Sequence, residues 1–326
     1  MKKILAITVA SIIAAGSITA CSAETATNEV SDEKISIVTT IFPEYDWVMN
    51  VLGDNPAGAE VTILLDDGVD LHSYQPTVDD IMKIADCDLF IYVGGESDEW
   101  VEDALAEATN DDMIVINLLD VLGDSVVVEE VVEGMEGEEE EAEEEEGPEY
   151  DEHVWLSLRN AKVLVESIEE ALVTIDPDNE STYRQNADSY EAELTVLDEE
   201  YSAVVSQAAC DTVLFGDRFP FRYMTDDYGL NYYAAFVGCS AETEASFETI
   251  TFLANKVDEL SLTAVLTIEG ADHSIAETIV ENTSAQDQQI LTLDSMQSVT
   301  ASDVEAGASY ISIMESNLEV LREALS

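Results

Sequence analysis

The chain has 326 residues, 46% of them hydrophobic, which is enough to bury one large core or two medium ones. Its 72 acidic residues against 11 basic ones give a formal net charge of −61. Such an acidic surface repels nucleic acid and anionic lipid headgroups, and it raises the local concentration of cations. We therefore expect no nucleic-acid partner.

The first twenty residues have the composition of a bacterial export signal. The basic "MKK" precedes a short apolar run, "ILAITVASIIAAG", which is too short for a comfortable transmembrane helix. The ending "ITAC" resembles the lipobox, in which the cysteine is lipidated and becomes the mature N-terminus. We expect a lipoprotein signal peptide over residues 1–20, lipidation of Cys21 and a flexible tether over 21–33. The protein would then be extracytoplasmic and anchored to the cell membrane.

Eight short apolar runs predict strands in two groups of four. The first group covers 34–40, 60–65, 88–94 and 113–118, and the second covers 212–216, 232–237, 264–269 and 289–294. Continuous apolar strands that alternate with helical patterns favour parallel sheets covered on both faces. This pattern therefore predicts an α/β fold with two lobes, which cover residues 34–175 and 210–326. Each lobe would hold a four-stranded, mainly parallel sheet flanked by helices.

A long helix is predicted between the lobes, over residues 176–209. Asp176 and Pro177 suit a helix start. Tyrosine, leucine and alanine then recur at three- and four-residue spacing, at Tyr183, Ala187, Tyr190, Leu194, Leu197 and Tyr201. One uninterrupted helix between two lobes acts as a rigid strut.

An acidic insert occupies residues 129–152 and contains fifteen Asp or Glu residues. Like charges at this density keep a segment extended and solvated. We expect a long surface loop projecting from the first lobe.

Three cysteines follow Cys21. Export permits a disulfide, and Cys210 and Cys239 are the expected pair because both lie in the C-terminal half. Cys87 follows a helical pattern and precedes an apolar run, where a buried free thiol is expected. The absence of CxxC spacing argues against a thiolate metal cluster.

The chain contains only three histidines. His72 follows the strand at 60–65, His273 follows the strand at 264–269, and His153 lies between the acidic insert and a helix. Ligands of open α/β sheets bind beyond the carboxyl ends of the strands. Imidazole is a preferred zinc ligand, so the three histidines form a candidate site. No HxxxH or HExxH pair fixes the geometry locally, and ordinary turn histidines remain the alternative.

Two histidine motifs resemble those of a known family. "GVDLHSYQPT" and "DEHVWLSL" are similar to the ligand motifs of the metal-binding solute receptors of bacterial zinc and manganese ABC importers, the cluster A-I receptors. The C-terminal segment after "LDSMQSVT" resembles the end of the same family, so the similarity runs from about Ile35 to the end. The resemblance implies two lobes joined by one rigid helix, with a single metal ion in the cleft between them.

The resemblance assigns ligands residue by residue. His72 and His153 match the two histidines of the first lobe. The third ligand position falls on Arg218, which cannot bind a cation, so the neighbouring Asp217 is the expected substitute. His273 occupies the fourth position, and a water could replace Asp217.

Two carboxylates lie close to His273 in the sequence. Glu269 and Asp272 are expected to orient its second nitrogen. Acidic residues favoured by a helix N-terminus are the alternative explanation.

This ligand set implies the cargo. Three nitrogens and one oxygen favour Zn²⁺, whereas manganese sites rely on carboxylates. We expect a monomeric receptor that delivers zinc to an ABC permease and its ATPase, and not an enzyme. The alternatives are a manganese or iron receptor of the same family, a three-histidine zinc hydrolase, or an adhesin without a bound metal. The glutamate run stands where many zinc receptors of the family carry a histidine-rich loop, and we expect it to concentrate cations weakly.

Overall fold

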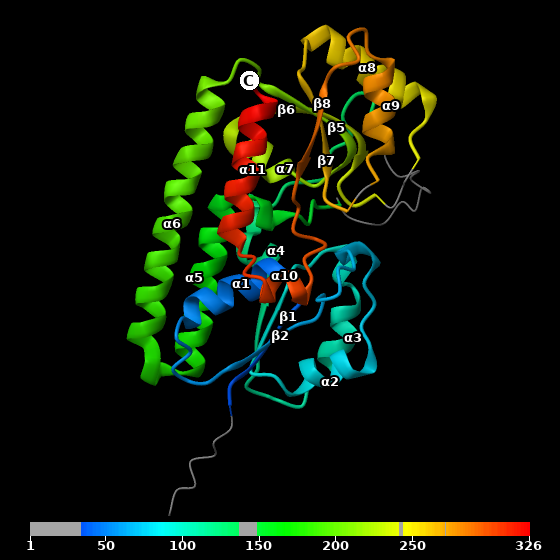
Figure 1. Cartoon of the computed structure of the whole chain (residues 1–326). Coiled ribbons are helices and arrows are strands. Elements are labelled where there is room, and N and C mark those ends of the chain that lie inside the picture. The colour runs from blue at the N-terminus through cyan, green and yellow to red at the C-terminus, as the bar shows by residue number, and fades with distance from the viewer. Residues whose placement is uncertain (1–33, 137–148, 241–243, 271) are drawn as a thin grey trace, which may run out of the picture. The chain divides into compact units, whose positions relative to one another are not determined.

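The computed structural model describes residues 34–136, 149–240, 244–270 and 272–326. The expected signal peptide, the tether, Cys21 and the glutamate run lie outside the described residues. Within the described part of the chain, two lobes each hold a four-stranded parallel sheet (Figure 1). No helix in that part is both long enough and apolar enough to cross a bilayer. The predicted fold class is confirmed.

The N-terminal lobe has the strand order β2-β1-β3-β4, with all pairs parallel. Its strands are β1 (Ser36–Thr39), β2 (Glu60–Ile63), β3 (Leu89–Tyr92) and β4 (Ile114–Asn117). Its helices are α1 (Phe42–Leu52), α2 (Val78–Asp86), α3 (Trp100–Ala106), α4 (Leu118–Leu122) and α5 (Leu158–Ile175). All four strands predicted for this lobe are present, each slightly shorter than its apolar run.

The C-terminal lobe repeats this arrangement with the order β6-β5-β7-β8. Its strands are β5 (Thr212–Phe219), β6 (Asn231–Val237), β7 (Ala264–Ile268) and β8 (Gln289–Leu293). Its helices are α7 (Arg222–Tyr228), α8 (Phe247–Leu260), α9 (Ser274–Asn282), α10 (Ala301–Glu305) and α11 (Tyr310–Ala324). His72 lies in the loop after β2 and His273 in the loop after β7, whereas His153 lies between the acidic insert and α5.

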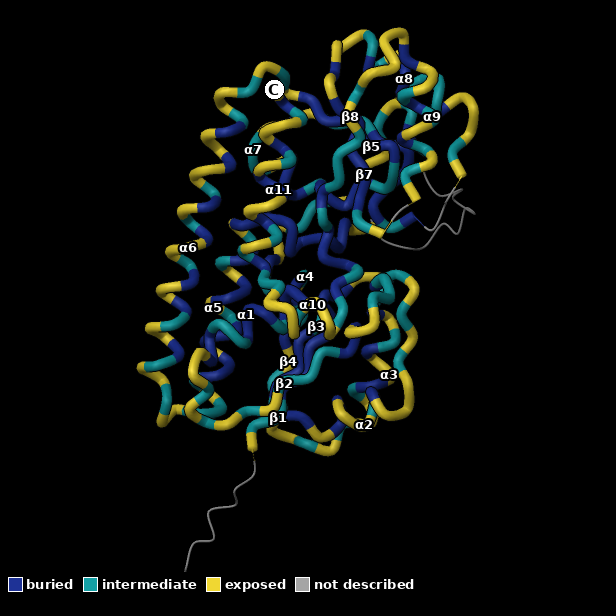
Figure 2. Tube along the Cα trace, viewed as in Figure 1, coloured by how far each residue is buried: buried dark blue, intermediate teal, exposed yellow. Residues whose placement is uncertain are grey.

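Helix α6 (Glu180–Gln207) joins the lobes and follows a 3₁₀ turn at Pro177–Asn179. Its 28 residues extend about 42 Å at 1.5 Å per residue. The predicted stripe is buried, and Figure 2 shows the burial alternating along the helix. Tyr190 donates a hydrogen bond to Asp46 in the first lobe, and Tyr201 donates one to the Met314 carbonyl oxygen in α11. One helix therefore packs against both lobes.

A hydrophobic core continues from one lobe into the other. Trp47 of α1 and Tyr310 of α11 form an edge-to-face pair with ring centroids 5.3 Å apart. The Tyr310 hydroxyl donates a hydrogen bond to the Trp155 carbonyl oxygen, and the Trp155 indole donates one to the Ser295 carbonyl oxygen. Because buried side chains cross the boundary between the lobes, the cleft loops stand on a stiff base.

The acidic insert is not only a projecting loop. Its described first part, through Glu136, lies against the C-terminal lobe, where the Glu136 amide donates to the Ala235 carbonyl oxygen at the edge of β6. The Glu136 carboxylate accepts from the Ser246 amide, and the Met135 side chain is buried. Backbone pairing and one apolar anchor hold this part in place despite the surrounding charge. The expectation of a wholly solvated loop is therefore wrong for Glu129 to Glu136.

Candidate metal centre

His72 lies in a 3₁₀ turn, Leu71–Ser73, beyond the end of β2. The Asp70 carboxylate caps this turn by accepting a hydrogen bond from the His72 amide at 3.0 Å. The Nδ1 atom of His72 lies 2.7 Å from the Ser97 hydroxyl and 3.5 Å from a carboxylate oxygen of Glu152. These contacts favour the ring proton on Nδ1. The lone pair of Nε2 is then available to bind a metal ion.

His153 is fully buried immediately before the 3₁₀ turn Val154–Leu156. The Asp151 carboxylate accepts from the His153 amide at 2.9 Å and lies 3.0 Å from its Nδ1 atom. One carboxylate therefore fixes both the backbone and the ring of this histidine. As in His72, the Nε2 atom is the one left to bind a ligand.

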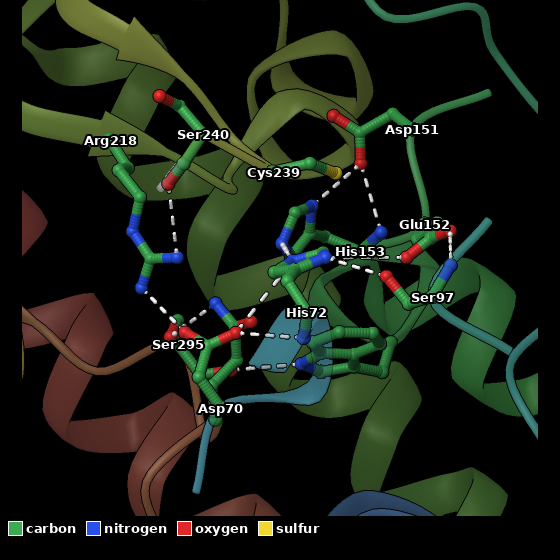
Figure 3. A network of polar contacts seen from close by, with 12 residues as sticks. Asp70, His72, Ser97, Asp151, Glu152, His153, Arg218, Cys239, Ser240 and Ser295 are labelled. Carbon is green, nitrogen blue, oxygen red and sulfur yellow. Dashed lines mark hydrogen bonds and ion pairs between the residues drawn. The ribbon is translucent and has the colours of Figure 1, made fainter. Parts of the chain in front are cut away.

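The two Nε2 atoms face each other at 3.2 Å (Figure 3). Two nitrogens bound at about 2.0–2.1 Å to one tetrahedral ion lie about 3.3 Å apart. If both rings carry their protons on Nδ1, two lone pairs point at each other, which is unfavourable unless a cation or proton lies between them. The separation of the two Nε2 atoms would therefore suit two ligands of one metal ion.

Burial keeps the first imidazole neutral. Desolvation, followed by the neighbouring His153, lowers the pKa of His72 to about 3. Burial also opposes charging of His153, but Asp151 and the other nearby carboxylates outweigh it and raise the pKa of His153. A cation that replaces the shared proton would be stabilised by the same carboxylates.

Cys239 lies beside the two histidines. The ligand atoms of His72, His153 and Cys239 all lie within 4.8 Å of one another, and no other group of this kind occurs among the described residues. The cysteine follows β6, with only Gly238 between them. A Cβ on Gly238 would lie 2.8 Å from Cε1 of His153, so only glycine lets this backbone pass the imidazole.

The expected disulfide is wrong, because Cys210 and Cys239 are both free. Cys210 precedes β5 and Cys239 follows β6, which pairs with β5 in parallel. The two cysteines therefore lie at opposite ends of a seven-residue strand, which spans roughly 23 Å, far beyond disulfide reach. Cys87 is buried and free, as predicted.

Arg218 and Asp217 lie inside strand β5, which runs past the predicted end at residue 216. The register shifts between Phe215 and Arg218, and this irregularity turns the two side chains toward the cleft. The Arg218 guanidinium pairs with Asp70 at 2.6 Å and lies 3.5 Å from the Ser240 carbonyl oxygen (Figure 3). Asp217 accepts from the amides of Arg218 and Ile268. An ion pair therefore joins the lobes beside His72.

His273 and Asp217 line a cavity of about 510 Å³. Asp70 and Arg218 line the same cavity, which adjoins the pair formed by His72 and His153. Neither His273 nor Asp217 belongs to the group formed by His72, His153 and Cys239. Two of the four predicted ligands thus lie together. A part for His273 and Asp217 in metal binding stays a prediction.

Glu269 and Asp272 have other partners than the expected one. Glu269 accepts from the amide and hydroxyl of Ser295 and from the Gln297 amide, and so holds the loop after β8. Asp272 accepts from the Ser274 amide at the start of α9. Asp272 also interacts electrostatically with His273, and an orienting role for either carboxylate stays a prediction. The helix-terminus explanation fits Asp272.

Sequence inspection missed Asp151, Glu152, Ser97 and Cys239. The two acids directly precede His153, and this spacing is a usable signal for carboxylates that orient an imidazole. Cys239 comes two residues after a predicted strand, where ligands of α/β sheets gather. Ser97 had no comparable signal, because it reaches His72 only through the folded chain.

This chain is similar to zinc-uptake proteins. Residues 37–324 match the family described as zinc-uptake complex component A, periplasmic. The zinc-binding lipoprotein AdcA of Streptococcus pneumoniae serotype 4 is 32% identical over 293 residues, which cover 90% of this chain and 56% of that protein. The chain thus spans about half the length of that relative. The high-affinity zinc uptake system protein ZnuA of Bacillus subtilis is 29% identical and is covered to 88%.

A solved structure shows the same fold. The Zn(II)-bound ZnuA-like domain of Streptococcus pneumoniae AdcA superposes with a TM-score of 0.69 at 29% identity, covering 90% of this chain and 99% of that domain. The match includes both lobes and the long helix, because it extends over nearly all described residues. With the family match over residues 37–324, this chain belongs to the zinc-uptake complex component A family of periplasmic solute-binding proteins.

Proposed function

We propose that this protein is an extracytoplasmic receptor that captures Zn²⁺ and delivers it to an ABC importer. The observation that carries the proposal is the pair of Nε2 atoms facing each other at 3.2 Å, each on a ring whose other nitrogen contacts a polar side chain. The zinc-binding names of the relatives, and the Zn(II)-bound domain of similar fold, support zinc as the cargo.

The site suits binding and release of an ion. His72 and His153 each supply an Nε2 atom. On the other side of the rings, Asp151 lies 3.0 Å from Nδ1 of His153 and Glu152 lies 3.5 Å from Nδ1 of His72. His153 is fully buried and anchored, whereas His72 lies on a short turn capped by Asp70. We infer that the turn carrying His72 is the part that yields on release, because the strands and the shared core beneath it are stiff.

Delivery would require partners that this chain does not contain. We propose that the partners are an ABC permease and its ATPase. We also propose that the receptor is a monomer and that a lipid on Cys21 anchors it to the membrane. The net charge of −61 favours accumulation of cations near the cleft and opposes nucleic-acid binding.

Metal analysis of the purified protein, followed by competitive zinc and manganese titration, tests the proposal. We expect one zinc per chain and preference for zinc. His72→Ala or His153→Ala should weaken zinc binding at least about 100-fold, since each removes a direct ligand. Preference for manganese, or unchanged affinity in both variants, would overturn the proposal.

His273→Ala is the variant that tests the predicted third histidine. A loss of zinc affinity comparable to that of the other two would place His273 in the ligand set, and an unchanged affinity would exclude it. Zinc-dependent hydrolysis of esters or phosphates by the wild type would favour a hydrolase, the second candidate, because an open zinc position activates water.

A further inference from the structure

Cys239 stands where a metal held by the two histidines would need its next donor. The Cys239 sulfur and one ring nitrogen each of His72 and His153 lie within 4.8 Å of one another, although the three residues are far apart in the sequence. Figure 3 shows the cysteine reaching from the end of β6 toward the ring of His153. Gly238 allows the close approach, so the backbone itself is shaped to bring this side chain to the pair.

The residue of β5 at the family's third ligand position offers no donor atom for a metal. Arg218 occupies the residue to which the family motif assigns a ligand, and its guanidinium has only N–H donors. It is held by the Asp70 carboxylate at 2.6 Å and by the Ser240 carbonyl oxygen at 3.5 Å. Ser240 directly follows Cys239, so the contact that fixes the arginine also fixes the backbone beside the thiol.

The chemistry of Cys239 fits this place. It is partly buried and free of any disulfide, and three acidic side chains lie near it: Glu129, Asp151 and Glu152. Burial, followed by these carboxylates, raises the pKa of the thiol. When the S–metal bond forms, the S–H proton leaves to the solvent.

We propose that Cys239 is a ligand of the transported metal, together with Nε2 of His72 and Nε2 of His153. This rests on the proposed function and adds the donor that sets its selectivity. A thiolate favours zinc, cadmium and copper(I) and disfavours manganese, which prefers oxygen donors. Arg218 reinforces this choice, because it replaces an additional ligand that a six-coordinate ion would use.

Cobalt(II) is the probe that distinguishes this inference from the proposed function. A cysteine ligand gives Co²⁺ an intense sulfur-to-metal charge-transfer absorption in the near ultraviolet, which histidine and carboxylate ligands do not give. We expect one Co²⁺ per wild-type chain with this absorption, and its loss on addition of one equivalent of zinc.

Cys239→Ser should abolish the absorption while Co²⁺ still binds. It should lower the affinity for zinc about 10- to 100-fold and lower the affinity for manganese less. Cys210→Ser is the matched control, since its sulfur lies at the opposite end of the sheet, and it should behave as wild type. Far-ultraviolet circular dichroism of Cys239→Ser checks that the fold is kept, and Cys239→Ala provides a second variant that removes the donor.

Two results separate the possible failures. Stoichiometric Co²⁺ binding without the charge-transfer absorption, or with an absorption that survives in Cys239→Ser and Cys239→Ala, overturns the cysteine ligand and leaves the receptor intact. Failure of the wild-type protein to bind zinc or cobalt overturns the proposed function itself.

Discussion

At the scale of single residues, the site depends on what stands behind each imidazole. Asp151 contacts both the amide and the ring of His153, and Ser97 and Glu152 flank the ring of His72. Such partners fix the ring orientation and raise the basicity of the nitrogen that binds the metal. The ligand motif therefore extends beyond its histidine to the acids that precede it.

Asp151→Asn tests this arrangement. The amide keeps the shape of the side chain but loses the negative charge beside His153, so we expect zinc affinity to fall about 10- to 100-fold with the stoichiometry unchanged. Isothermal titration with a competing chelator measures the affinity. Asp198→Asn, on helix α6 and paired with Arg159, makes the same charge change elsewhere and should leave zinc binding unaltered. Equal affinities in the two variants would argue against an orienting role for Asp151.

At the scale of elements, helix α6 connects the lobes through one buried stripe. Leu194 is fully buried on this stripe, whereas Val196, two residues later, is 56% exposed. The difference arises because a helix turns about 100° per residue, so positions two residues apart lie on nearly opposite faces. The stripe packs against α1 and α5 at one end and α11 at the other, which makes the helix part of both lobes.

Leu194→Ala should lower the free energy of unfolding by about 2–5 kcal/mol, since it removes buried methyl groups and leaves a cavity between helices. Val196→Ala on the exposed face should change it by no more than about 0.5 kcal/mol. Urea denaturation followed by circular dichroism compares the two variants with the wild type. Equal destabilisation would mean that α6 is not held by this stripe.

At the scale of the whole molecule, acidity extends into the core. Burial raises the pKa of Asp46 and of Asp294 to about 6, and that of Asp98 to about 7, from an ordinary value of 3.8. The native state therefore binds these protons more tightly than the unfolded chain does. Their stabilising contribution is complete below about pH 4 and is lost as the pH rises through 6 and 7.

We expect the metal-free protein to lose stability between about pH 4 and pH 7, measured as a fall in the midpoint of thermal unfolding. Asp46→Asn imitates the protonated acid, whose oxygen accepts from Tyr190 and Tyr310 at the junction of the lobes. The variant should match the wild type below about pH 4 and exceed it increasingly as the pH rises to about 7. Added salt screens the repulsion among surface carboxylates in both proteins, so a difference that persists in salt belongs to the buried group. A pH dependence identical to that of the wild type would exclude Asp46.

Much of this protein follows from local patterns in its sequence. The apolar runs predicted all eight strands, the spacing of Tyr183 to Tyr201 predicted the buried stripe, and two short motifs pointed to His72 and His153. These features are determined by neighbours in the chain: periodicity fixes which face is buried, and a motif places its side chain at the end of a strand.

What the sequence left undecided depends on residues distant in the chain. Whether Cys239 pairs with Cys210 or joins the histidines depends on which ends of parallel strands β5 and β6 they occupy, and on how closely Gly238 passes His153. Whether Glu269 serves His273 or the loop at Ser295 depends on contacts across the sheet. Sequence alone predicted a two-lobed α/β fold with His72 and His153 in one site. Only the tertiary structure decided which side chains surround those histidines, because these side chains come from distant parts of the chain and share no local pattern in the sequence.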